Sequence, residues 1–161
     1  MDAVERFAAA VAAFRDWARG TDTGEAAVRA ALLHITRLYL AALELPAVRW
    51  DEVVNQPEAD RVNDTEWRAV YDATARLPLD YYGSVFYPLI VPPEESPSIG
   101  SVSDDIADLY RDTVSGLRAL EAGLRAVAVW DWKFHFRHHW GKHATDAIGA
   151  LHAWLAENAS E

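Results

Sequence analysis

The sequence contains no cysteine among its 161 residues. This absence excludes a disulfide scaffold, a zinc site built on thiolates and a cysteine nucleophile. A chain without cysteine fits a reducing compartment, so we expect a cytoplasmic protein.

Basic residues are also scarce. Lysine and arginine total 15 against 25 aspartates and glutamates, which gives a formal net charge of -10. A strongly acidic chain repels phosphate backbones and anionic lipid surfaces, so we expect no nucleic-acid partner and no membrane partner. No apolar run approaches about 18 uninterrupted residues, and acidic residues precede the first apolar stretch, so the pattern predicts neither a membrane span nor a signal peptide.

Several catalytic and cofactor-binding motifs are missing as well. The eight glycines are scattered, with no G-x-G-x-x-G, no G-x-x-x-x-G-K-[ST] and no G-x-S-x-G. The sequence also lacks H-E-x-x-H and the paired E-x-x-H motifs of di-iron bundles. These absences argue against a nucleotide-binding loop, a serine hydrolase elbow, a zinc protease and a di-iron oxidase.

What the sequence does contain is helical periodicity. Hydrophobic residues make up 51% of the chain and charged residues 25%, which is an ordinary globular composition. Apolar residues recur at spacings of three and four, and the pattern predicts an all-α, single-domain helical bundle (residues 1–161) of about five helices. The predicted helices are 2–19, 22–45, 63–77, 101–124 and 126–158. We expect the last helix to lie at the centre of the bundle, with a kink near Gly141.

Two segments interrupt this pattern. Residues 46–62 predict no more than a single amphipathic turn. Residues 77–102 hold five of the seven prolines and several tyrosines, so they predict a long Pro- and Tyr-rich crossover loop between the third and fourth helices. Its aromatic content suggests that it packs down on the bundle. It is then either a strap that fills a gap in the core or a lid over a ligand.

Histidines and aspartates are crowded in two places. His135, His139 and His143 are spaced four apart, which on a continuous helix stacks them along one face, and Asp146 follows three residues later. Asp105, Asp108 and Asp112 share a face of the predicted fourth helix in the same way. If these two faces meet, they form a site of nitrogen and oxygen ligands. We expect His138 and His152 to be structural.

Three interpretations of this site remain open. It is a structural network of buried ion pairs, a binding site for a small ligand, or a metal site formed by His139, His143, Asp105 and Asp108. No cofactor is assigned, and a divalent transition metal is the less favoured alternative. The favoured function is a non-enzymatic interaction or small-ligand-binding module, with a protein partner or self-association supported by seven tryptophans. The alternative is a metal-dependent or acid–base enzyme.

Two segments also resemble a known family. The pattern D-D-x-x-D-L-Y-x-D and the pattern W-x-W followed by H-W-G-x-H-A are similar to the signature of the bacterial family called the domain of unknown function numbered 5063. The resemblance implies an intracellular helical fold and implies no activity. It places the candidate ligand-binding residues within or beside the shared segments; they are Asp105, Asp108, Tyr110, His139, Trp140, His143 and Asp146.

Overall fold

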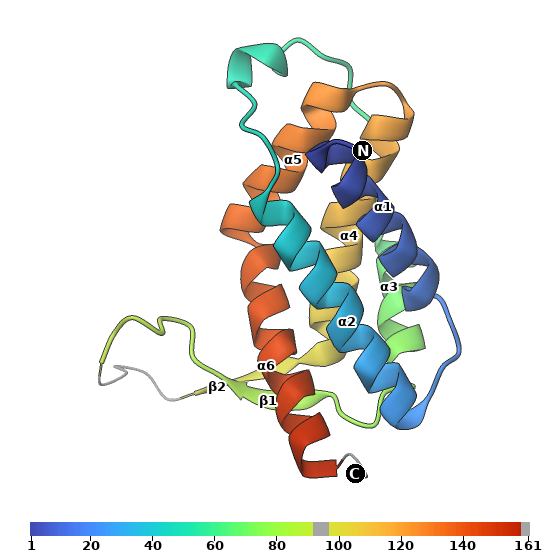
Figure 1. The fold of residues 1–161 in the computed structure, drawn as a ribbon, viewed down its shortest axis with the longest axis vertical. Helices are drawn as coiled ribbons and strands as arrows, with labels where there is room; N and C mark the ends of the chain where they lie inside the picture. The colour runs from blue at the N-terminus through green and yellow to red at the C-terminus, as the bar shows by residue number, and fades with distance from the viewer. Residues whose placement is uncertain (92–96, 159–161) are drawn as a thin grey trace.

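The computed structural model describes residues 1–91 and 97–158. Within these residues the chain forms a helical bundle with one small hairpin, so the predicted all-α class is confirmed (Figure 1). The elements are α1 (Ala3–Ala18), α2 (Gly24–Leu43), the 3-10 helix η1 (Trp50–Glu52), α3 (Asp64–Thr74), β1 (Tyr81–Ser84), β2 (Ser98–Ser101), α4 (Val102–Glu121), α5 (Arg125–His138) and α6 (Trp140–Asn158).

The first three helices begin and end close to where the sequence predicts. The side chains of Asp2 and Asn63 each accept a hydrogen bond from the backbone N–H three residues on, and the glutamate side chain at that position accepts one from the backbone N–H of the cap residue, which forms a capping box. One face of α1 is fully buried at Phe7 and Phe14. Burying such a side chain stabilises the fold by about 1.5–3 kcal/mol. Between α2 and α3, η1 is the single turn expected in residues 46–62.

The central helix of the bundle is α4, not the last helix as predicted. It packs against α1, α3, α5 and α6, and 14 of its 20 residues are buried. Only four residues of α5 are buried, because Trp130 and Phe134 stack on each other toward the outer side of the bundle. Aspartates on α4 are therefore held inside the molecule, with Asp105 and Asp112 each 3% exposed.

The predicted last helix is in fact two helices, α5 and α6, which meet end to end. His139 separates them with a non-helical backbone (φ -145°, ψ -87°). At this junction the carbonyl oxygen of Phe136 lies 2.2 Å from where a Cβ on Gly141 would be. No side chain fits there, so the glycine that predicted a kink is required by this close approach.

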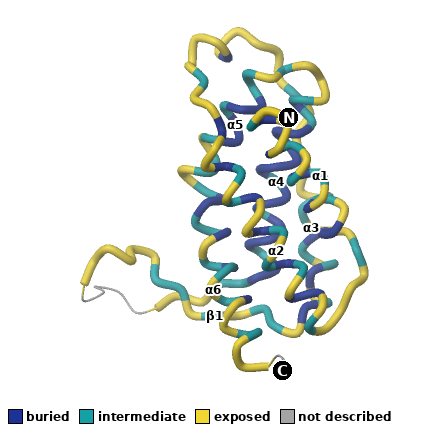
Figure 2. Tube along the Cα trace, viewed as in Figure 1, coloured by how far each residue is buried: buried dark blue, intermediate teal, exposed yellow. Residues whose placement is uncertain are grey.

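The crossover between α3 and α4 contains an antiparallel hairpin in place of the predicted loop without strands. β1 pairs with β2 in a register that sets Tyr82 opposite Gly100. The expectation that the whole crossover packs down on the bundle is wrong, because residues 86–91 project from it and are exposed (Figures 1 and 2). Leu89 is 95% exposed and Val91 85%. Pro97, directly before β2, cannot donate to a ladder, and α4 begins directly after β2, so each strand has only four residues.

Among the described residues, α2 alone is long and apolar enough to cross a membrane by length and composition. The sequence contains no uninterrupted apolar run of that length, because Arg29, His34 and Arg37 fall within the helix. One face of α2 packs against α1 and α6, and Ile35 and Leu38 are fully buried there. This is the packing of a helix with one face in the bundle and the other exposed, where Leu40 is 61% exposed.

Candidate functional site

The two polar faces predicted from the sequence meet between α4 and the α5–α6 junction. Asp105, Asp108 and Asp112 lie along α4, and each approaches an imidazole of the opposing helices. The break at His139 does not separate the histidines, since the ring centroids of His139 and His143 are 4.8 Å apart. We call Asp105, Asp108, Asp112, His135, His139 and His143 the His/Asp cluster.

Two imidazoles are oriented by buried carboxylates through the same ring nitrogen. Nδ1 of His143 lies 2.6 Å from Oδ1 of Asp105, and Nδ1 of His139 lies 2.7 Å from Oδ2 of Asp112. An ionised carboxylate only accepts hydrogen bonds, so Nδ1 is the donor in both pairs. The side chains of both aspartates are 5% exposed, whereas that of His139 is 42% exposed.

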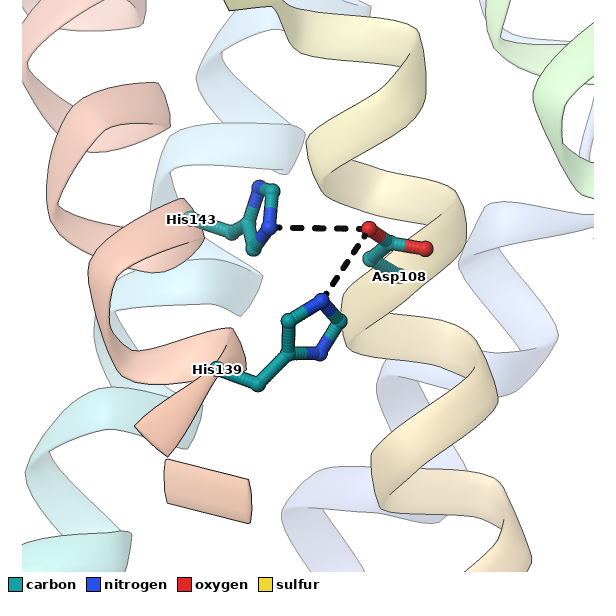
Figure 3. Close-up of side chains that lie close together, drawn as sticks. All are labelled: Asp108, His139 and His143. Carbon is teal, nitrogen blue, oxygen red and sulfur yellow. Dashed lines mark ion pairs between the residues drawn. The ribbon is translucent and has the colours of Figure 1, made fainter. Parts of the chain in front are cut away.

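The second ring nitrogens of these histidines then converge on Asp108. Nε2 of His139 and Nε2 of His143 each lie 3.5 Å from Oδ2 of Asp108 (Figure 3). The other oxygen of Asp108 accepts a hydrogen bond of 2.7 Å from the indole nitrogen of Trp67 on α3. Trp67 thereby fixes the carboxylate so that one oxygen faces both imidazoles.

The surrounding carboxylates favour positive charge in the cluster. The hydrogen bond to Asp112 raises the pKa of His139 above its ordinary value, even though burial acts against it. Burial also acts to lower the pKa of His143, but the contact with Asp105 outweighs it and the net shift is upward. The site therefore stabilises cations, whether these are protons on the imidazoles or a bound ion.

The hairpin supplies one further contact. The hydroxyl of Tyr82 on β1 donates to Oδ2 of Asp105 at 2.6 Å. A Cβ on the opposing Gly100 would lie 2.4 Å from the ring of Tyr82, so only glycine allows this ring to lie across β2 and reach α4. Both oxygens of Asp105 are thus occupied, one by His143 and one by Tyr82.

The other end of the cluster continues toward α5. His135 lies 3.6 Å from Asp112 through Nδ1 and 3.4 Å from Asp131 through Nε2. Asp131 also accepts a 3.0 Å hydrogen bond from Arg61. Carboxylates and imidazoles therefore alternate from Asp105 to Asp131.

The remaining predicted site residues lie elsewhere. Asp146 accepts hydrogen bonds from Ser84 and Lys142 and does not contact a histidine of the cluster. Tyr110 is fully buried under the guanidinium of Arg19, on another side of α4. Trp140 is also fully buried, and its ring packs against aromatic residues of the core.

Sequence reasoning missed Trp67 and Tyr82 as partners of this site. Trp67 lies within the predicted helix 63–77 and Tyr82 within the Pro- and Tyr-rich crossover 77–102. Both contact α4 over a long sequence separation, and no local spacing carries that information. The sequence signal for such partners is the row of acidic residues on α4, because a buried carboxylate needs hydrogen-bond donors from neighbouring elements.

Within the described residues, two groups have the composition and spacing of metal ligands. One is Asp108, His139 and His143, and the other is Asp112, His135 and His139. The two groups share His139. In the second group Nδ1 of His139 is already hydrogen-bonded to Asp112, so the first group is the better candidate.

Comparison with known proteins bears on the fold and the family. The crystal structure of protein BF1032 from Bacteroides fragilis is similar to this chain, with a TM-score of 0.78 at 18% sequence identity, covering 99% of this chain and 94% of that one. No curated protein matches the sequence. The family model described as Domain of unknown function (DUF5063) matches residues 1–157, including both segments on which the resemblance was based. The chain therefore belongs to the DUF5063 family.

Proposed function

We propose that this protein binds one divalent transition-metal ion through Nε2 of His139, Nε2 of His143 and a carboxylate oxygen of Asp108. The observation that carries the proposal is the convergence of both Nε2 atoms on one oxygen at equal distances of 3.5 Å. This site differs in one residue from the metal site that the sequence offered. Asp105, a candidate ligand there, is here the hydrogen-bond partner of His143.

The chemistry of the three atoms supports a cation at their centre. When Nδ1 carries the proton of a neutral imidazole, Nε2 presents a lone pair. Two such lone pairs and a carboxylate oxygen repel one another unless a positive charge lies between them. That charge is supplied either by protonating the imidazoles or by a metal ion.

Ligand spacing also fits a metal. Metal–ligand bonds of about 2.0–2.2 Å place the ligand atoms of a tetrahedral site about 3.4 Å apart. Each imidazole has a carboxylate on its Nδ1, which is the usual outer-sphere arrangement around metal-bound histidine. Zinc, iron, cobalt and manganese all accept two histidines and one carboxylate. Three protein ligands leave at least one position open for water or a small ligand, as in sites that perform chemistry.

The test is a titration of protein purified without a histidine tag. Zinc binding is measured by calorimetry, and cobalt binding by its visible absorption, which reports nitrogen and oxygen coordination. We expect one equivalent to bind the parent protein. Asp108→Asn is the informative variant, because it removes a ligand without disturbing either Nδ1 contact.

His138→Ala provides the matched control. His138 is exposed and neighbours His139 in sequence, but its ring contacts Phe134 and not the cluster. We expect the control to bind zinc as tightly as the parent. Asp108→Asn should lose more zinc affinity than the tenfold to hundredfold that is typical of changes in outer-sphere residues. Equal zinc affinity in the parent and Asp108→Asn would reject the site and favour a protonated structural network.

A second candidate function is association with a protein through the hairpin, for which a second copy of this chain is the simplest partner. The supporting observation is the row of exposed apolar side chains on residues 81–91 and 97–101, which includes Tyr81, Leu89, Val91 and Ile99 at 73–95% exposure. Exposed apolar groups of this kind mark interaction surfaces. The cytoplasm is the proposed location, because the chain has no cysteine to oxidise.

A further inference from the structure

A cleft on the outer side of α5 lies apart from the His/Asp cluster. The connection from α2 to η1 runs beside α5 there (Figure 1), and its Ala47 and Val48 form one wall. The volume is about 220 Å³, which is below the range of drug-sized pockets and suits a ligand with a single ring. Residues spaced three and four apart on one face of α5 form the other wall; they are Trp130, Lys133, Phe134, Arg137 and His138.

Aromatic rings form most of the apolar surface of this cleft. Trp130 and Phe134 stack with ring centroids 5.0 Å apart, and the ring of His138 lies 4.9 Å from that of Phe134. Phe134 is 44% exposed, so part of its ring is accessible to a ligand. Such rings offer faces against which a planar apolar group packs.

The charged side chains of the cleft are basic. Among the described residues, Lys133 and Arg137 line it, and no aspartate or glutamate does. Most basic side chains of this acidic chain are paired with carboxylates, as Arg61 and Arg118 are. Neither Lys133 nor Arg137 forms an ion pair with a carboxylate in residues 1–91 and 97–158. Arg137 is exposed, and Lys133 donates one hydrogen bond, of 2.8 Å, to the carbonyl oxygen of Leu45.

We infer that this cleft binds a small aromatic carboxylate. The carboxylate accepts hydrogen bonds from the guanidinium of Arg137, whose parallel N–H donors match its two oxygens. The ring of the ligand packs against Phe134 and Val48. Lys133 and Arg137 would repel an organic ammonium ion, and an uncharged aromatic molecule would form no ion pair. The inference does not rest on the proposed metal site, since no residue of the cleft is a ligand of that ion.

Three probes of matched size test the inference: 3-phenylpropionate, 3-phenylpropan-1-ol and 3-phenylpropylammonium. Each is titrated into metal-free protein, and binding is followed by tryptophan fluorescence and by NMR saturation transfer. We expect the carboxylate to bind at least about threefold more tightly than the alcohol, as for a hydrogen-bonded ion pair with an exposed guanidinium, and the ammonium ion to bind most weakly. Equal affinity for the carboxylate and the alcohol, or no binding of the carboxylate at millimolar concentration, would overturn the inference.

Variants assign the binding to the cleft. Arg137→Gln should remove the preference for the carboxylate over the alcohol, and the protein should still fold because this side chain is exposed. Phe134→Ala should weaken binding of both probes while the preference persists. Arg37→Gln is the matched control, because Arg37 on α2 is also exposed, forms no ion pair with a described carboxylate and does not line the cleft. A preference that survives in Arg137→Gln, or that is lost equally in Arg37→Gln, would reject the site.

Discussion

Nδ1 of His139 lies 2.7 Å from Oδ2 of Asp112. This contact decides which nitrogen of the ring faces Asp108, because an imidazole bonded through Nδ1 must turn Nε2 the other way. A side chain at a break between two helices would otherwise be free to rotate. The buried carboxylate therefore orients the most exposed of the three proposed metal ligands.

Removing Asp112 should weaken metal binding without removing a ligand. We expect Asp112→Ala to lower zinc affinity by about tenfold to a hundredfold, because His139 loses the partner that orients it and increases its basicity. The protein should still fold, since His139 is 42% exposed and can bond to water. Calorimetry measures the effect, with Asp64→Asn, an exposed partner of Arg111, as the control. An unchanged affinity in Asp112→Ala would show that His139 needs no such orientation.

The metal-free protein should become less stable as pH rises through the range in which His139 of the His/Asp cluster loses its proton. The pKa of His139 is raised in the folded state by its hydrogen bond to Asp112, from an ordinary value of 6.5. A group with a raised folded pKa stabilises the fold fully below its unfolded pKa and ceases to do so above its folded pKa. Thermal unfolding in a chelating buffer from pH 5.5 upward measures the trend, and His139→Gln should flatten it.

Stabilisation by zinc should depend on pH in the opposite direction to the stability of the metal-free protein. Metal ligands must lose their protons, so the increase in Tm caused by zinc should grow with pH over the same range. The comparison uses one protein under two conditions, which makes the parent its own control. A zinc effect that is independent of pH would contradict coordination by His139 and His143.

Two glycines on α6 should respond in opposite ways to alanine. At Gly141 a Cβ would lie 2.2 Å from the carbonyl oxygen of Phe136, so Gly141→Ala should destabilise the fold by about 1–3 kcal/mol as overpacking does. At Gly149 a Cβ meets nothing within 4 Å, so Gly149→Ala should stabilise α6 by about 0.5–1 kcal/mol. Denaturant unfolding measures both. Equal effects would show that the junction tolerates a side chain.

Self-association, if the hairpin mediates it, should depend on the exposed side chains of the hairpin. We expect the parent to sediment as a species larger than a monomer, and the double variant Leu89→Ser with Ile99→Ser to sediment as a monomer. Leu40→Ser on α2 is the control, because Leu40 is 61% exposed but lies outside the hairpin. A parent protein that is monomeric at all concentrations would exclude this role of the hairpin.

Much of the helical layout follows from local sequence signals. Capping residues at Asp2 and Asn63 and the apolar spacing of α1 predict helices that the structure contains. Spacing puts the aspartates of α4 on one face and the histidines on another but leaves open whether the two faces meet; in the structure Asp105, Asp108, His139 and His143 do meet. Periodicity works for the aspartates because α4 is a regular helix, whereas the histidines lie on α5, on the break at His139 and on α6, and still meet α4.

The failures arise where tertiary contacts decide. The many large aromatic side chains of residues 126–158 predict that the last helix is central, but the central helix is α4, which packs against four helices and has 14 of its 20 residues buried. The hairpin depends on register between β1 and β2, and nothing within either short strand specifies it. Trp67 could not be assigned to Asp108 because the contact joins two different helices.

Pairing each buried aspartate with its own imidazole also limits how this sequence can change over generations. Losing Asp105 alone would leave His143 without its acceptor, and losing His143 alone would leave a buried carboxylate short of one donor. A single replacement therefore costs more than the exchange of both residues together. Positions 105 and 143, and likewise 112 and 139, should vary as couples among descendants of a common ancestor.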